Sequence, residues 1–126
     1  MEPVYPPLVV DHFERPRNSG HFEPGEGIIE GHAGSVAQGT MFSLSARVSG
    51  QRIEAVRFEA YGCPHCIAAG SWLSERLVGL NQAELNAWSW REAGQVLAFP
   101  AEKRGRLLIL EDAVRSLGDA WARSGS

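Results

Sequence analysis

The hydrophobic period of this chain changes at Gly62-Cys63, and that change restricts the fold more than any other feature. Residues 41–48 and 52–61 alternate apolar and polar side chains, as two half-buried strands do, and Ser49-Gly50 offers a hairpin turn. From Ile67 onward, apolar residues recur at helical spacing. The sequence therefore predicts an α+β fold: a small antiparallel β-sheet packed against helices concentrated in the C-terminal half.

Several helices are expected around this sheet. Pro16 ends the first, Asn81 caps a short one, and Ser89 with Glu92 forms a capping-box pattern for the next. Gly79 is expected to close the helix that follows the cysteines. The expected helices cover residues 7–15, 67–80, 81–88, 89–99 and 106–123, and one further short strand is expected near Ile28-Ile29. The last helix is amphipathic, with an apolar stripe of Leu107, Leu110, Val114, Leu117 and Trp121.

Length and charge narrow the class of protein. The chain has 126 residues, of which 44% are hydrophobic and 21% charged, so we expect a single globular domain spanning 1–126. Its formal net charge of −3 and the shortness of its densest basic cluster, Lys103-Arg104-Arg106, argue against a nucleic-acid partner. No stretch approaches the length of a membrane span and the N-terminus lacks a signal pattern, so we expect a cytoplasmic protein without a membrane partner.

The only two cysteines lie in the segment YGCPHC, where the second strand stops and a helix begins. Unpaired N–H groups and the helix dipole stabilise a thiolate at that point, and a protonated His65 would add to the effect. Pro64 suits the first helical turn because its missing N–H has no partner there in any case. Cys66 lies one turn further, close enough for a disulfide or a shared metal. We therefore expect Cys63 to be the more reactive thiol.

Two other interpretations of CPHC remain open at this point. A strand, CPHC and a helix also form the local context of a thioredoxin-like oxidoreductase, but that fold needs further strands after the helix, and residues beyond Cys66 read as helical. Two buried structural cysteines are the plainer interpretation. It is disfavoured by the histidine and proline between them and by the position at a helix N-terminus.

Three segments, in order and with matching spacing, resemble the NifU/IscU-type iron–sulfur cluster scaffold family. They are Val10–Phe13 with Arg15–Asn18 and Gly20, then Arg57–Cys63 with Ile67–Ser71, and finally Leu108–Ala113. The resemblance implies a SufE/NifU-like fold, which agrees with the α+β pattern. Within the first segment we expect His12, Asp11 and Asn18 to be structural, whereas His21 and His32 lie in a glycine-rich stretch and are expected to be solvated.

The resemblance also implies where cluster ligands should lie. The family holds a nascent cluster with three cysteines, helped by an aspartate and a histidine. One of these cysteines matches Cys63. The others are replaced: a C-G-D loop reads Gln38-Gly39-Thr40, and an H-C pair reads Gly105-Arg106. Arginine cannot be deprotonated to coordinate a metal, so most of the family's ligands are absent.

This chain gains Cys66 and His65 beside Cys63. We expect Cys63 and Cys66 to bind the cargo, an iron–sulfur cluster or iron, with His65 as a third metal ligand and zinc as an alternative. Two thiolates supply half of the usual four ligands. The rest could come from His32, a loop carboxylate, glutathione or a second subunit.

The resemblance implies a non-enzymatic scaffold that receives sulfur from a cysteine desulfurase on Cys63 or Cys66. The family's docking stretch for an Hsp70-type chaperone reads Phe99-Pro100-Ala101-Glu102-Lys103 here, and its departures weigh against that partner. Two other functions stay open: a thiol–disulfide redox protein using the CPHC pair, and a non-catalytic regulator that binds a desulfurase.

Overall fold

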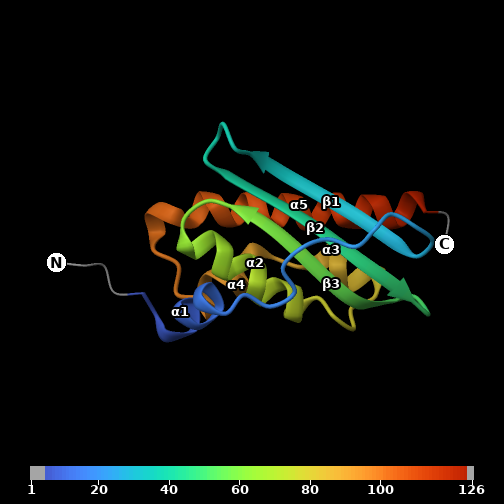
Figure 1. Ribbon diagram of the computed structural model, residues 1–126, viewed down its shortest axis with the longest axis horizontal. Coiled ribbons are helices and arrows are strands. Elements are labelled where there is room, and N and C mark those ends of the chain that lie inside the picture. Colours follow the sequence, from blue (N-terminus) through green and yellow to red (C-terminus); the bar gives the residue numbers. More distant parts are fainter. Residues whose placement is uncertain (1–4, 125–126) are drawn as a thin grey trace.

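The computed structural model describes residues 5–124 and contains a three-stranded antiparallel sheet of order β1-β2-β3 (Figure 1). The strands are β1 (Ile28–Ser35), β2 (Thr40–Ser49) and β3 (Arg52–Tyr61). The helices are α1 (Pro7–Glu14), α2 (Pro64–Arg76), α3 (Gln82–Ala87), α4 (Trp90–Val96) and α5 (Arg104–Arg123), with a 3-10 turn η1 (Ala101–Lys103) before α5. The predicted α+β fold is confirmed. No strand follows α2 in the described part of the chain, which excludes the thioredoxin fold there.

The alternation in the two predicted strands places one face of the sheet in the core. Phe42, Leu44 and Ala46 are buried, and the register sets Leu44 opposite Phe58. The first strand is longer than the short one expected near Ile28. Its second half carries small and polar residues because α5 comes very close: a Cβ on Gly31 would lie 2.3 Å from the backbone nitrogen of Leu117. Such a strand has no apolar period to detect.

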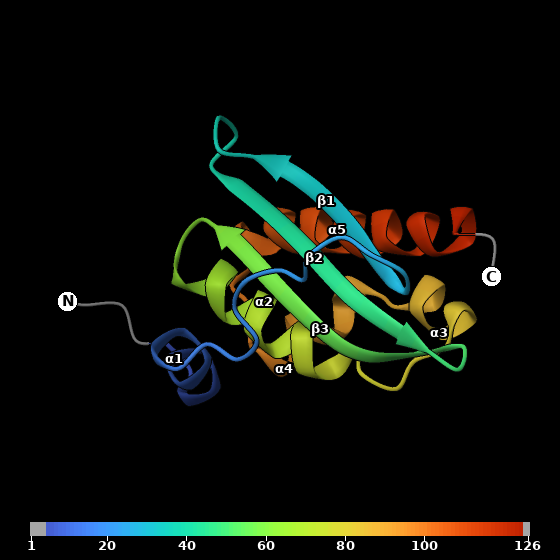
Figure 2. The same cartoon turned by 45° about the vertical axis from the view of Figure 1, so that its right-hand side comes forward.

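The helices form a second layer over this face of the sheet (Figures 1 and 2). α5 packs on β1 and β2, α2 packs on β3, and α1 packs on α2. The predicted stripe of α5 is buried throughout. In α2 the buried face is made mostly of small residues, while Ile67 is only partly buried. A Cβ on Gly70 would lie 2.5 Å from the Phe58 ring, so the small residues bring α2 close to β3.

The helix ends and caps differ from expectation at several places. α2 runs from Pro64 to Arg76 with Leu77 as its C-cap, so Gly79 does not close it as predicted. The reciprocal capping box is formed by Asn81 and Glu84 at the start of α3. Ser89 does cap α4, by accepting from the backbone N–H of Arg91, but the Glu92 carboxylate instead accepts from Trp88 and Arg76. The box predicted at residues 89–92 is therefore only half formed, because Glu92 has stronger partners from other elements. α4 also ends earlier than expected, at Val96.

The segment that opens the family motif is fixed to the middle of α2 by what we call the serine anchor: Ser71 and Ser74 with His12, Arg17 and Asn18. Ser71 Oγ accepts from the Arg17 backbone N–H and lies 2.8 Å from His12 Nδ1. Asn18 donates to Ser74 Oγ, and Ser74 donates to the Ser71 carbonyl. Asp11 accepts from the guanidinium groups of its neighbours Arg15 and Arg17. The prediction of structural roles for His12, Asp11 and Asn18 is thus confirmed. Between residues 5 and 124, no helix has both the length and the apolarity to cross a membrane.

Candidate functional site: a dithiol at the N-terminus of α2

Cys63 is the N-cap of α2, between the end of β3 and the first helical turn. Pro64 occupies the first turn, as its missing N–H predicts, and Cys66 lies one turn on with its N–H donating to the Cys63 carbonyl. Cys63 is partly exposed, whereas Cys66 is fully buried. Both thiols are free, and their Sγ atoms lie 3.9 Å apart. One sulfur therefore faces the outside and the other lies directly behind it.

Gly62 forms the cover over the buried sulfur. Its φ of 150° is one that L side chains rarely adopt, and an added Cβ would lie 2.8 Å from Cys66 Sγ. The same Cβ would lie 3.4 Å from the carbonyl oxygen of Gly39, so the β1–β2 loop borders the site. In both views this loop, the end of β3 and the start of α5 lie toward the same end of the molecule (Figures 1 and 2).

Lys103, at the end of η1, supplies the positive charge of the site. Its Nζ lies 3.8 Å from Cys63 Sγ and 3.2 Å from His65 Nδ1. Since a lysine ammonium has only donors, His65 accepts through Nδ1 and carries its proton on Nε2. The His65 ring is buried between Tyr5 and Phe99, at centroid distances of 4.8 and 5.0 Å. His65 and its two aromatic neighbours thus hold Lys103 beside the exposed thiol.

The two thiols have opposite electrostatic environments. Burial alone would raise the pKa of Cys63. The backbone N–H groups of Cys66 and His65, the Cys66 thiol and the Lys103 charge together hold that pKa below its ordinary value. For Cys66, burial and the neighbouring Cys63 raise the pKa to about 11. These directions agree with the expectation that Cys63 is the more acidic thiol.

One expectation about His65 is corrected. Burial and the positive charges of Lys103 and Arg106 lower its pKa, so the ring is neutral near pH 7 and cannot stabilise a thiolate by its charge. Lys103 takes that role. The three predicted metal ligands, Cys63, Cys66 and His65, share the start of α2, where His65 Nδ1 lies next to Lys103 Nζ. Within the described residues, no three His, Cys, Asp or Glu side chains come together to hold a metal ion.

The positions that carry ligands in the family do converge here, but with other chemistry. The Gln38-to-Thr40 turn borders Gly62, with Gln38 exposed and Thr40 buried. Gly105 faces open space. The charge of Arg106 acts to lower the pKa of both Cys66 and His65, which places it near the site as well. The surroundings of the thiols are therefore mostly positive charge, glycine and neutral groups, with the acidic Glu102 also acting on His65.

The remaining histidines stay apart from the thiols. His12 belongs to the serine anchor, with its ring Nε2 3.9 Å from Glu75. His32 is exposed and lies 2.8 Å from Ser43 Oγ, and His21 is exposed beside Glu59. His32 was expected as one source of a further ligand, and its contacts join it to the sheet surface instead.

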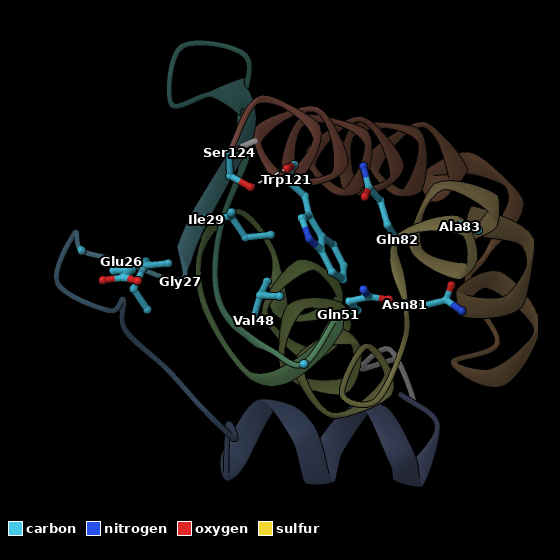
Figure 3. Close-up of a pocket in the computed structure, with 13 residues that line it drawn as sticks. Glu26, Gly27, Ile29, Val48, Gln51, Asn81, Gln82, Ala83, Trp121 and Ser124 are labelled. Atoms are coloured by element: carbon cyan, nitrogen blue, oxygen red, sulfur yellow. Dashed lines mark hydrogen bonds between the residues drawn. The ribbon is translucent and has the colours of Figure 1, made fainter. Parts of the chain in front are cut away.

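A surface hollow in the described residues lies elsewhere (Figure 3). It has a volume of about 860 Å³ and is lined by Gly27, Val48, Asn81 and Trp121, among others. Trp121 lies in the last turn of α5, and Lys103 directly precedes its first turn. A helix of this length spans about 30 Å, so hollow and dithiol lie at opposite ends of the molecule. No cysteine, histidine or lysine lines the hollow.

Comparisons with known proteins agree with this architecture. The NifU-like N terminal domain family matches residues 4–117. The chain is 36% identical over 129 residues to the bifunctional protein NifU/MnmA of Rubrobacter xylanophilus, covering 99% of this chain but only 26% of that protein. It is 32% identical to the iron–sulfur cluster assembly scaffold protein IscU of Escherichia coli, covering 90% of each. An iron–sulfur cluster assembly scaffold protein of the SUF system from Fervidobacterium islandicum has the same fold, with a TM-score of 0.66 at 16% identity over 90% of this chain and 96% of that chain. The chain belongs to the NifU-like N-terminal domain family.

Sequence reasoning missed Lys103 as a site residue. The short basic cluster at residues 103–106 served only as an argument against a nucleic-acid partner, and the resemblance placed Lys103 in a docking stretch. A signal was available, because the positions matching the family's H-C pair follow immediately and should approach Cys63. Gly62 has no distinguishing signal within its motif, because its steric role depends on the buried position of Cys66.

Proposed function

We propose that this chain works in iron–sulfur cluster assembly as a scaffold-type carrier that accepts sulfur on Cys63. The observation that supports it most is the placement of a partly exposed thiol at a helix N-terminus, 3.8 Å from Lys103, in a chain of this family. Cys66 is covered, so Cys63 is the sulfur that a large partner reaches. Reduced thiols are required, which fits a cytoplasmic location.

The sulfur donor in this proposal is the persulfide of a cysteine desulfurase. The Cys63 thiolate attacks the terminal sulfur of that persulfide, a new S–S bond forms on Cys63, and the donor's S–S bond breaks. The donor's cysteine leaves as a thiolate. The donor returns to the thiol level and Cys63 becomes a persulfide, so no outside oxidant is needed and the chain acts as a sulfur carrier that turns over no small substrate.

For iron or a [2Fe–2S] cluster, the proposal assigns Cys63 and Cys66 as two ligands. Their 3.9 Å separation suits two thiolates on one metal, since metal–sulfur bonds are about 2.3 Å long. His65 enters as the residue that positions Lys103 and not as a third ligand. A complete site needs further ligands from another molecule.

Sulfur loading is tested with purified protein, a cysteine desulfurase and cysteine under anaerobic conditions. Intact-mass measurement and peptide mapping should locate one added sulfur on Cys63. Cys63→Ser should abolish loading, while Cys66→Ser should still be loaded. Absence of added sulfur on Cys66→Ser, or equal loading of Cys63→Ser, would contradict the proposal.

A further inference from the structure

The two thiols differ in access as well as in acidity. Cys63 is partly exposed, and Cys66 has no exposed surface because the backbone of Gly62 covers its sulfur. The group closest to Cys66 Sγ that could react with it is Cys63 Sγ, 3.9 Å away. A partner protein can therefore exchange sulfur with Cys63 only, and Cys66 can react only with whatever Cys63 carries.

We propose that Cys66 reduces a persulfide carried by Cys63, so that the chain itself converts delivered sulfur to sulfide. This inference rests on the proposed function, because it begins from the sulfur loaded on Cys63. It adds a second activity to carrying: the dithiol provides the two electrons that turn sulfane sulfur into the form found in clusters.

The step balances within the chain. Cys66 Sγ attacks Cys63 Sγ, the Sγ–Sγ bond forms, and the bond from Cys63 Sγ to the terminal sulfur breaks. The terminal sulfur keeps the electron pair of that bond and, with its own proton, leaves as hydrosulfide, while the proton lost by Cys66 is released to solvent. Two thiols become one disulfide as one sulfane sulfur becomes sulfide.

The geometry of the first turn suits this attack. Residues three apart at a helix start have Cα atoms about 5 Å apart, within the range that disulfides span. The sulfurs already face each other, and the partly exposed Cys63 has room to turn toward the buried one. The Sγ–Sγ distance of 3.9 Å has to shorten to about 2 Å for the bond to form, and rotation of the Cys63 side chain acts in that direction.

Lys103 is placed to assist departure of the sulfide. Its ammonium lies 3.8 Å from Cys63 Sγ, where it can donate to a second sulfur attached there. His65, fixed between two aromatic rings, keeps the lysine in that position. The lysine thus faces the leaving group, while Cys66 attacks from the protein interior.

The altered family positions fit this chemistry. Gln38, Thr40, Gly105 and Arg106 lie around the thiols, so the chain has few groups that could retain iron. The positive charge at this site favours an anionic product such as hydrosulfide. The sulfide would then pass to iron held by another molecule. The disulfide left behind needs a low-molecular-weight thiol or a dithiol protein to reset it for the next cycle.

The test is a single-turnover experiment without added reductant. The wild-type chain and Cys66→Ser are loaded with a desulfurase and cysteine, separated from both, and incubated anaerobically. Sulfide is measured colorimetrically, and intact mass reports the state of the cysteines. The wild type should release one sulfide per added sulfur and end two hydrogen masses below the reduced chain. Cys66→Ser should keep the added sulfur and release none.

The outcomes separate this inference from the proposed function. If the loaded wild type keeps its added sulfur and releases no sulfide, the inference fails while sulfur acceptance stands. If Cys66→Ser releases sulfide as fast as the wild type, Cys66 is not the reductant and the inference also fails. If neither chain gains sulfur, the proposed function fails and the inference with it. The one-to-one ratio of sulfide to disulfide is measured on the wild type, so it does not depend on the variant folding.

Discussion

Two turns of the same helix, α2, carry polar groups that are arranged in opposite ways. In its middle, Ser71 and Ser74 are fully buried and each has partners from the segment that precedes the sheet. At its N-terminus, Cys63 is partly open and its charged neighbour Lys103 comes from η1, just before α5. The middle joins parts of the chain to each other, whereas the first turn presents a group to the outside.

This difference explains which parts of the family pattern remain in the chain. Residues of the serine anchor hold the fold, and their hydrogen bonds would be left unsatisfied if one partner changed. The ligand positions around Cys63 have no such internal partners: Gly105 faces open space and Gln38 is exposed. Replacing them changes the chemistry of the site without disturbing the core.

The largest effect on the free energy of unfolding is expected for Gly62→Ala, which tests the close packing of residue 62 against Cys66 in the first turn of α2. The change forces a φ of 150° on alanine and places Cβ 2.8 Å from Cys66 Sγ. Gly79→Ala is the matched control, because its φ of 91° is also positive but its Cβ meets nothing. The control should cost about 1–2 kcal/mol, and Gly62→Ala about 1–3 kcal/mol more. Urea unfolding measures both, and equal losses would mean that the sulfur is free to move aside.

Ser71→Ala is expected to have the next largest effect, and it tests whether the serine anchor acts independently of the first turn of α2. It removes the acceptor of the Arg17 N–H and the partner of His12 Nδ1, leaving buried polar groups unsatisfied, so the free energy of unfolding should fall by about 1–3 kcal/mol. Sulfur loading of the folded protein should be unchanged. Cys63→Ser is the converse control: it should abolish loading and change stability by less than about 0.5 kcal/mol, since the position is a partly exposed N-cap. A Ser71→Ala protein that is stable but cannot be loaded would show that the two turns are coupled.

A smaller effect is expected from Lys103→Met. The Lys103 charge lowers the pKa of Cys63 less than the hydrogen bonds from Cys66 and His65 do, and burial raises that pKa. The pKa of Cys63 should rise toward its ordinary value. Alkylation by iodoacetamide near pH 7 should then slow, by about tenfold for each unit of pKa change. Arg104→Met removes the same charge from an exposed neighbour and should leave the alkylation rate alone. If both variants react like the wild type, Lys103 does not act on the thiol.

The sequence predicts a feature when that feature arises from neighbouring residues, and it does not when the feature depends on residues far apart in the chain. The strands, the stripe of α5 and the position of Cys63 at a helix start arise from local period and turn chemistry, and they are predicted. The length of β1 and the neutral state of His65 depend on packing. Position 31 has no room for a side chain because α5 lies against it, and His65 is neutral because it is buried between Tyr5 and Phe99. Such contacts join residues far apart in the sequence and leave no local pattern.

The smallest effect is expected from the two buried histidines. His12 lies in the serine anchor and His65 in the first turn of α2. Burial, followed by Arg17, lowers the pKa of His12, although Glu75 and Asp11 act in the opposite direction. The pKa of His65 is lowered for a similar reason. The unfolded chain therefore binds more protons than the folded one, so stability is complete above the ordinary histidine value of about 6.5 and is lost as pH falls below it. His12→Asn, which keeps a polar group near Ser71, should flatten this loss between pH 7 and pH 5, by at most about 1.4 kcal/mol for each pH unit. Urea midpoints measured across that range, with each protein's value at pH 8 as its own reference, provide the check. A profile as steep as that of the wild type would assign the loss to His65, and hence to the first turn rather than to the serine anchor.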